Sequence, residues 1–218
     1  MAKNYNLVVF FDFDNTIARV DVFDDLVQRF AKDSHWIRLE ERWKNGKIGS
    51  KECLEGQLKS VGITRKKLDK YLAGIKIDPY FKKVVSFLRS RKIKTTVLSD
   101  NFDYFLKRIL AHHGIRNLKV YSNRVQFKKD NLTPSFPFRN KKCGACAHCK
   151  SKNLLANAPI DNIIMYIGDG RSDICPAQQS DIIFAKDSLA AYCREHGIRY
   201  IPFRSLKKVY HYLQRGLA

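Results

Sequence analysis

Five polar residues with catalytic potential follow apolar stretches of the sequence at short distances: Asp12, Asp14, Ser99, Asp169 and Asp173. A carboxylate can attack phosphorus and form an acyl phosphate, which divides one slow hydrolysis into two easier steps. A second carboxylate nearby can deliver and remove the proton that each step requires. Further carboxylates and a hydroxyl can hold a divalent cation and the phosphate oxygens. This combination of residue types predicts hydrolysis of a phosphate monoester.

The spacing of the first two aspartates predicts a different role for each. Asp12 comes directly after the apolar residues 7–11 and is the predicted nucleophile. Asp14, two residues further along, can point to the same side, protonate the departing alkoxide and then accept a proton from the attacking water. We therefore expect an aspartyl-phosphate intermediate on Asp12.

Several carboxylates close to a phosphate dianion require a cation. Oxygen ligands suit Mg²⁺, a hard cation that keeps several of its waters. The predicted ligands are Asp12, the backbone carbonyl of Asp14, and Asp169. Asp173 is predicted to be a further ligand or a partner of the ligands, and Mg²⁺ is the expected cofactor.

The non-bridging oxygens of the phosphate need hydrogen-bond donors. The predicted donors are the Ser99 hydroxyl, the backbone N–H of Asp100, and Gly170. A lysine should complete the ring of positive charge. The candidates close together in the sequence are Lys142, Lys150 and Lys152.

Four short apolar segments are typical of buried β-strands and would position these residues. They comprise residues 7–11, 95–98, 163–167 and 182–184. Segments with helical spacing lie between them. This alternation predicts an α/β fold with a Rossmann-like parallel sheet and helices on both faces. Because the carboxyl ends of parallel strands meet at one edge, the polar residues should gather there.

Residues 19–78 interrupt the alternation of strands and helices. They contain four stretches of apolar residues at helical spacing and no strand signal. We therefore predict a core formed by residues 1–18 and 79–218, with an all-helical insertion formed by residues 19–78.

The order of the motifs resembles that of the haloacid dehalogenase superfamily of phosphatases. The resemblance covers nearly the whole chain and rests on Asp-x-Asp-x-Thr, a Ser at a strand end, a Lys and Gly-Asp-Gly-x-x-Asp. Asn15 stands where Gly is commoner in the family, and Asn also tolerates turn conformations. The resemblance implies the family's fold, Mg²⁺ and covalent intermediate, and a small helical cap at residues 19–78. Lys150 matches the position of the family's lysine.

Within the superfamily the chain resembles the phosphoserine-phosphatase-like branch. More narrowly, residues 43–53, 146–150 and 167–177 resemble the group near the methionine-salvage hydroxy-keto-methylthiopentenyl-phosphate phosphatase. Asp21 follows Asp12 by nine residues, the spacing at which phosphoserine phosphatases place an acidic residue that holds the substrate amine. In the alternative interpretation, Asp21 begins a helix and complements its dipole. The cap is expected to select the substrate.

Three of the six cysteines, Cys143, Cys146 and Cys149, lie within seven residues. Thiolates at this spacing can hold zinc, but a closed structural site needs a fourth ligand. His148 would reach the same ion awkwardly, so that ligand would have to come from elsewhere in the chain. Structural Zn²⁺ is therefore not expected, and the thiols are interpreted as inert or redox-labile.

The chain of 218 residues carries 41 Lys and Arg against 21 Asp and Glu, a formal net charge of +20. This surplus predicts attraction to anions, whether nucleic acid, membrane headgroups or phosphorylated small molecules. The apolar runs are too short for a bilayer, which needs roughly 20 residues, and no signal peptide is visible. Six cysteines without an export signal favour the reducing cytoplasm.

The combined prediction is a cytoplasmic, Mg²⁺-dependent phosphomonoesterase that acts on a small phosphorylated metabolite. The substrate candidates are the methionine-salvage enol phosphate, a phosphoserine-like compound and an amino-alcohol phosphate. Two alternatives are a phosphatase of nucleic-acid ends and a non-catalytic basic nucleic-acid-binding module. A small cap closing over the site argues against the first, and the intact aspartates argue against the second. We expect neither nucleic acid nor a membrane as partner, and the sequence indicates no oligomeric state.

Overall fold

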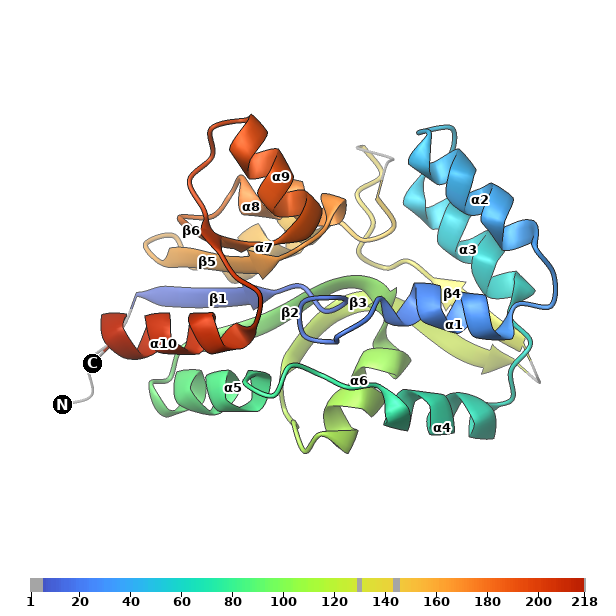
Figure 1. Ribbon diagram of the computed structural model, residues 1–218, viewed down its shortest axis with the longest axis horizontal. Coiled ribbons are helices and arrows are strands. Elements are labelled where there is room, and N and C mark those ends of the chain that lie inside the picture. The colour runs from blue at the N-terminus through green and yellow to red at the C-terminus, as the bar shows by residue number, and fades with distance from the viewer. Residues whose placement is uncertain (1–5, 129–130, 143–145, 218) are drawn as a thin grey trace.

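The computed structural model describes residues 6–128, 131–142 and 146–217 (Figure 1). Its strands are β1 (Leu7–Phe11), β2 (Lys94–Phe102), β3 (Lys119–Lys128), β4 (Asn131–Ser135), β5 (Ile163–Gly168), β6 (Ile182–Ala185) and β7 (Ile201–Pro202). Within the described residues they form one sheet in the order β4-β3-β2-β1-β5-β6-β7. Neighbouring strands are parallel except β3 and β4, which are antiparallel.

Helices cover both faces of the sheet, as the sequence predicts. The helices outside the insertion are α5 (Phe81–Ser90), α6 (Asp103–His112), α7 (Lys150–Asn157), α8 (Ile174–Ala177), α9 (Asp187–Glu195) and α10 (Leu206–Gly216). A 3-10 turn, η1 (Arg171–Asp173), precedes α8. Helices α5, α6 and α10 pack on one face, and α7, α8 and α9 lie on the other (Figure 1).

Strand β1 is apolar throughout because both of its faces are covered. Leu7, Val9 and Phe11 belong to the hydrophobic cluster shared with α5, α6 and α10. Val8 and Phe10 belong to the cluster on the other face, shared with α7 and α9. Side chains alternate between the two faces of a strand, so a continuous apolar run is what a central parallel strand requires. This central strand fixes the position of the residue that follows it, Asp12.

Strand β2 is longer than predicted and contains an irregularity at its carboxyl end. Ser99 pairs with Ser122 and Phe102 pairs with Asn123, so two residues of β2 have no partner on β3. Such a bulge bends the strand and redirects its side chains. The two inserted residues are Asp100 and Asn101, which both reach the site described below.

Four helices form the insertion after β1. They are α1 (Val22–Phe30), α2 (His35–Lys44), α3 (Ser50–Ser60) and α4 (Arg65–Gly74). The chain leaves the core and returns to it at one place, where Ala18 forms an antiparallel bridge with Ile77. Helices α1 and α4 contribute to the main hydrophobic cluster, whereas Leu39, Ile48 and Cys53 of the α2–α3 region form a separate small cluster. The insertion is therefore continuous with the core through α1 and α4, and its exact domain boundaries stay a prediction.

The predicted α/β fold is confirmed, but the sequence analysis did not anticipate every element. It missed β3, β4 and β7, as well as α7, α8 and α10. Strand β7 is two residues long, and neither β3 nor β4 contains a long apolar run. Among the described residues, no helix has the length and apolar character needed to cross a membrane.

Candidate active site

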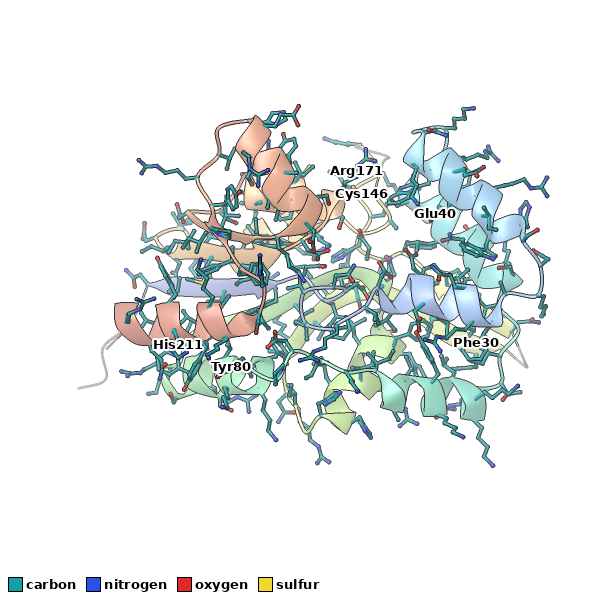
Figure 2. The ribbon with its side chains drawn as sticks, in the orientation of Figure 1. Phe30, Glu40, Tyr80, Cys146, Arg171 and His211 are labelled. Carbon is teal, nitrogen blue, oxygen red and sulfur yellow. The ribbon has the colours of Figure 1, made fainter. Side chains whose placement is uncertain are left out.

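A cavity of about 370 Å³ lies at the carboxyl ends of β1, β2 and β5. We call it the strand-end cavity. Residues from the sheet side include Asp12, Asp14, Asp100, Lys150 and Asp169. Helices α1, α2 and α3 line the other side. Glu40 on α2 and Arg171 after β5, both labelled in Figure 2, line this cavity from the insertion and from the sheet.

Asp12 and Lys150, which both line this cavity, form a buried ion pair. The Nζ atom of Lys150 lies 2.5 Å from Oδ1 of Asp12 and 2.7 Å from Oδ1 of Asp173. It also donates a hydrogen bond to the Ser172 hydroxyl at 2.9 Å. Burial alone would lower the pKa of Lys150, but the charges of Asp12 and Asp173 outweigh burial and hold that pKa well above its usual value. The ammonium group therefore stays charged.

Asp173 holds this arrangement together through four hydrogen bonds. Its Oδ1 accepts from Lys150 and, at 2.6 Å, from the hydroxyl of Tyr166. Its Oδ2 accepts from the backbone N–H groups of Asp169 and Gly170 at 2.9 and 3.0 Å. A Cβ on Gly168 would lie 2.5 Å from this oxygen, so that position requires glycine. Asp173 thus fixes both the lysine and the turn that carries Asp169.

Asp14 lies in a different hydrogen-bond environment from Asp12. Its carboxylate accepts from the side-chain amide of Asn101 at 3.0 and 3.2 Å and from the backbone N–H of Val22 at 2.9 Å. The Ser99 hydroxyl donates to it at 3.4 Å. Asn15, the next residue, has a φ of 53°, the left-handed conformation that Asn tolerates. Among the ion pairs found in the described residues, Lys150 pairs with Asp12 and Asp173 and not with Asp14.

Burial raises the pKa of Asp12, Asp14 and Asp169 in the strand-end cavity. The pKa values of Asp12 and Asp14 lie well above the usual range, mainly through desolvation. The next cause is the charge of Asp173 for Asp12 and the charge of Asp21 for Asp14. Burial, followed by the charge of Asp173, raises the pKa of Asp169 to about 6. Carboxylates that ionise at such a cost require a cation nearby.

The donor set fits a hard divalent cation. Oxygen atoms of Asp12, Asp169 and Asp173 lie within 4.8 Å of one another, and this is the one group of three or more such residues found in the described part of the chain. The hydroxyl of Thr16 donates to Asp169 at 2.8 Å and orients that carboxylate. Asp173 already accepts four hydrogen bonds, which favours its role as a partner of the ligands. The side chain of Asp14 is held elsewhere, so Asp14 would contribute its backbone carbonyl.

The predicted phosphate donors differ in how they are placed. Ser99 is fully buried, and the residues lining the strand-end cavity do not include it. Asp100 lines the cavity, and one of its buried carboxylate oxygens has no hydrogen-bond partner among the described residues. The backbone N–H of Gly170 already donates to Asp173. Of the predicted donors, Lys150 is the one whose side chain lies beside Asp12, and the assigned roles stay predictions.

Comparison with known proteins gives the family. Residues 7–192 match the family model described as Putative Phosphatase. The chain belongs to this family of phosphatases. A 2-hydroxy-3-keto-5-methylthiopentenyl-1-phosphate phosphatase of Brevibacillus brevis is 28% identical over 213 residues, covering 96% of each chain. A protein of the same name from Bacillus cereus is 28% identical over 213 residues, covering 94% of each chain.

Solved structures share the fold of this phosphatase. The phospho-aspartyl intermediate analogue of phosphoserine phosphatase superimposes with a TM-score of 0.74 at 19% identity, covering 96% of this chain and 99% of that one. A haloacid dehalogenase family hydrolase from Salmonella enterica serovar Typhi also superimposes with a TM-score of 0.74 at 19% identity. The match covers 94% of this chain and 70% of that one. These structures confirm the predicted fold, and the family match confirms the predicted phosphatase class.

The choice among the three candidate lysines of this phosphatase follows from burial. Lys150 is 3% exposed and begins α7, whereas Lys142 and Lys152 are exposed. The backbone N–H of Cys149 donates to the Phe138 carbonyl at 3.0 Å and anchors the loop before α7. The geometry therefore favours Lys150 as the lysine of the active site.

His148 joins the strand of Ser99 to the helix that carries Lys150. Its Nδ1 donates a hydrogen bond to the Ser99 carbonyl at 2.8 Å, and its Nε2 accepts one from the Asn153 amide at 2.8 Å. The proton lies on Nδ1 because a carbonyl can only accept. Burial, followed by the charge of Lys150, lowers the pKa of His148 to about 4, so the ring stays neutral. With both ring nitrogens engaged, His148 does not serve as a zinc ligand here.

The three-cysteine prediction falls partly outside the described residues. Cys143 lies outside them, whereas Cys146 and Cys149 are half-buried. No group of three potential ligands in the described ranges includes a cysteine. The interpretation of these thiols, and the expectation of no structural zinc, stay predictions.

The insertion lines the strand-end cavity with carboxylates. Asp21 lines the cavity and also caps α1, accepting from the backbone N–H of Asp24 at 2.9 Å. Both of the roles considered for Asp21 are therefore compatible with its position. Asp24 and Glu40 line the same side of the cavity, and we call Asp21, Asp24 and Glu40 the acidic wall. The Nζ atom of Lys44 lies 3.2 Å from Oε1 of Glu40. Burial, followed by the charges of Asp21 and Glu40, raises the pKa of Asp24 to about 7.

The sequence analysis missed four residues that shape the site: Asn101, His148, Tyr166 and Glu40. Tyr166 gave a signal, because a phenol in a buried strand normally requires a hydrogen-bond partner. The position of Asn101 was also visible in the sequence, because Asn101 follows the predicted site residue Ser99 by two residues. His148 and Glu40 reach the site through tertiary packing, and no local pattern marks them.

Proposed function

We propose that this phosphatase hydrolyses a small phosphate monoester in a Mg²⁺-dependent reaction through an aspartyl-phosphate on Asp12. One observation carries the proposal: Asp12 and Asp14 share one cavity but have different partners, Lys150 for the first and Asn101 with Val22 for the second. Carboxylates in different environments can take different protonation states and therefore different roles. An ionised Asp12 suits a nucleophile, and a protonated Asp14 suits a general acid.

Two displacements at phosphorus follow from this assignment. In the first, an oxygen of Asp12 forms a bond to phosphorus while the bond to the ester oxygen breaks, and Asp14 gives its proton to the leaving oxygen. In the second, water attacks phosphorus and gives a proton to Asp14, while the bond between phosphorus and Asp12 breaks. Inorganic phosphate leaves, and both aspartates return to their initial states.

Positive charge must accompany the phosphate into a cavity rich in carboxylates. Asp12, Asp169 and the backbone carbonyl of Asp14 would hold Mg²⁺, with Asp173 orienting the group. When bound, Mg²⁺ would offset the negative charge of the carboxylates and the phosphate. Lys150 supplies a fixed positive charge to the phosphoryl oxygens.

The acidic wall of the insertion favours a substrate with an amine at the end opposite the phosphate. Asp21, Asp24 and Glu40 face the strand-end cavity, with Lys44 as their nearby cation. Of the predicted substrates, an amino-alcohol or amino-acid phosphate fits this wall better than the uncharged methylthio chain of the enol phosphate. Such a metabolite fits a cavity of about 370 Å³.

We retain the predicted cytoplasmic location as part of this proposal.

The test of the reaction combines chelation with trapping of the intermediate. Turnover of an aryl phosphate should stop when Mg²⁺ is chelated and return when Mg²⁺ is restored. Acid quenching during turnover should leave one phosphoryl group on the peptide that contains Asp12, and Asp12→Asn should abolish both signals. Full turnover under chelation would remove Mg²⁺ from the proposal, and an active Asp12→Asn variant would remove the nucleophile.

The test of the substrate class uses a matched pair of esters. We expect 2-aminoethyl phosphate to be hydrolysed with a kcat/KM at least about tenfold above that of propyl phosphate, its uncharged analogue. The double variant Asp24→Asn, Glu40→Gln should remove this preference while leaving propyl phosphate turnover close to wild type. An unchanged preference, or a far higher kcat/KM for the methionine-salvage enol phosphate, would reject the amine and leave the phosphatase assignment intact.

A further inference from the structure

A second hollow lies along the β7 edge of the sheet, between α9 and α10. It measures about 790 Å³ and shares no lining residue with the strand-end cavity. Figure 1 shows the chain running from α9 to α10, two helices that lie on opposite faces of the sheet. We call this hollow the basic groove. Its six basic side chains are Lys186, Arg194, Arg204, Lys207, Lys208 and Arg215.

The charge of the basic groove is almost entirely uncompensated. Asp187 is the one carboxylate among its lining residues, and it lies 3.8 Å from Lys186. In the described part of the chain, no other ion pair involves any of the six basic side chains. All of these side chains except that of Lys186 belong to exposed residues. These cations come from α9, from α10 and from the residues that precede each helix. They repel one another, so their grouping favours a ligand with several negative charges.

We propose that the basic groove binds the phosphate backbone of a nucleic acid, away from the site of hydrolysis. The six cations are spread over two helices and the segments that precede them, which suits a linear polyanion rather than a single small anion. His211 and Tyr200 also line the groove and offer ring surfaces among the cations. The proposal assigns a role to part of the +20 charge that phosphate hydrolysis does not require.

The shape and composition of the groove favour nucleic acid over an anionic membrane. A membrane surface is bound best by a face that combines basic residues with exposed apolar side chains able to enter the lipid. Among the described residues, the exposed large apolar side chains are Val20, Ile37, Leu155, Ile160 and Ile163, and none belongs to α9, β7 or α10. The groove is also concave, which suits a strand better than a bilayer surface.

The test compares two variants with the same change in charge. The groove variant carries Arg204→Gln, Lys207→Gln and Lys208→Gln. The control carries Lys66→Gln, Lys67→Gln and Lys70→Gln on α4, where all three residues are exposed and have no ion pair among those found in the described residues. Figure 1 places α4 at the opposite end of the molecule from α9 and α10. Binding of labelled single-stranded and duplex oligonucleotides is measured by fluorescence anisotropy over a range of salt concentrations.

We expect the groove variant to bind at least about tenfold more weakly at about 0.1 M salt, and the salt slope of log K to fall by roughly 3. The control should change the affinity by less than about twofold, because charges beyond a Debye length of about 10 Å are screened. Both variants should hydrolyse an aryl phosphate at the wild-type rate, which shows that they are folded.

Three outcomes would overturn the proposal. Equal loss of affinity in the two variants would mean that binding is spread over the whole basic surface. Tighter binding to anionic lipid vesicles than to either oligonucleotide, lost in the groove variant, would identify a membrane surface instead. Competitive inhibition of aryl phosphate hydrolysis by the oligonucleotide would place the strand in the strand-end cavity. None of these results depends on the natural substrate of the phosphatase. The proposed function is therefore tested independently of the basic groove.

Discussion

The strand-end cavity and the basic groove have opposite charges, although both belong to a chain with a net charge of +20. Seven acidic side chains line the cavity against three basic ones, whereas six basic side chains line the groove against one carboxylate. The site proposed to receive the phosphate ester is thus the acidic one. Net charge describes the average field around the protein, and it does not locate the residues that do chemistry.

The two regions also differ in how each positive charge is held. Lys150 is buried and contacts two carboxylates, so its ammonium group has a fixed position and little contact with water. Lys207 and Lys208 in the groove are exposed and solvated. A buried charge interacts strongly with a few partners, while exposed charges act weakly, together and in a salt-dependent way. One substitution should therefore have very different effects in the two regions.

Lys150→Met should have the largest effect on hydrolysis. It removes the cation that lies 2.5 Å from Asp12, whose charge lowers the pKa of that buried carboxyl, so Asp12 would take up a proton more readily. A protonated Asp12 cannot attack phosphorus. We expect kcat/KM for an aryl phosphate to fall about 10²–10³-fold.

The same change elsewhere provides the control for Lys150→Met. Lys152→Met, on the same helix but exposed, and Lys207→Met, in the basic groove, should each leave kcat/KM within about twofold of wild type, as surface substitutions usually do. Comparable losses in all three variants would mean that hydrolysis depends on the overall field of the protein, and the distinction between the two regions would disappear.

Tyr166→Phe should lower kcat less than Lys150→Met does, but more than the matched substitution in the basic groove. The phenol donates to Asp173 at 2.6 Å, next to the hydrogen bond from Lys150. A hydrogen bond to a charged group contributes about 1.5–3 kcal/mol, so we expect kcat to fall roughly 10–100-fold with little change in KM. Tyr200→Phe, at the groove, should leave kcat unchanged. A change in melting temperature without a change in kcat would limit Tyr166 to a structural role.

The predicted site residues that the structure brings together are those whose position follows from the end of a strand. Asp12 and Asp169 directly follow β1 and β5, and the parallel register that pairs Phe11 with Ile167 brings the two aspartates together. That arrangement could be inferred from two apolar runs. The turn at Asn15 could also be inferred, because its side chain tolerates the observed φ of 53°.

Residues that depend on two or more packed elements could not be predicted in this way. His148 bridges the β2 strand and α7, and Glu40 reaches the cavity from α2, so neither position can be read from a local pattern. Helix α10 is a different case. Leu206, Val209 and Leu213 have helical spacing, so the helix was visible in the sequence and was overlooked.

Asp24→Asn tests how much the mutual repulsion and burial of the acidic wall destabilise the folded protein. It should have the smallest effect of these variants, a change in the free energy of unfolding. The pKa of Asp24 is about 7 in the folded protein and 3.8 for an unperturbed Asp, so the folded state binds the extra proton between these values. Stability should therefore fall as pH rises through this interval, and the full loss is reached above about pH 7. Asn cannot ionise and avoids this loss.

We expect Asp24→Asn to raise the free energy of unfolding by about 1 kcal/mol near pH 8, because burial also raises the pKa of Asp21 and the two neighbouring carboxyls share the cost of ionisation. The gain should shrink as the pH is lowered toward 4. Asp187→Asn, which removes the carboxylate of the basic groove, should not stabilise the protein, since this carboxylate is exposed and faces cations. Denaturant unfolding at several pH values measures both variants. A gain for Asp24→Asn that grows as the pH falls would show that the wall carboxylate is stabilised by its neighbours, and would remove the contrast between the two regions.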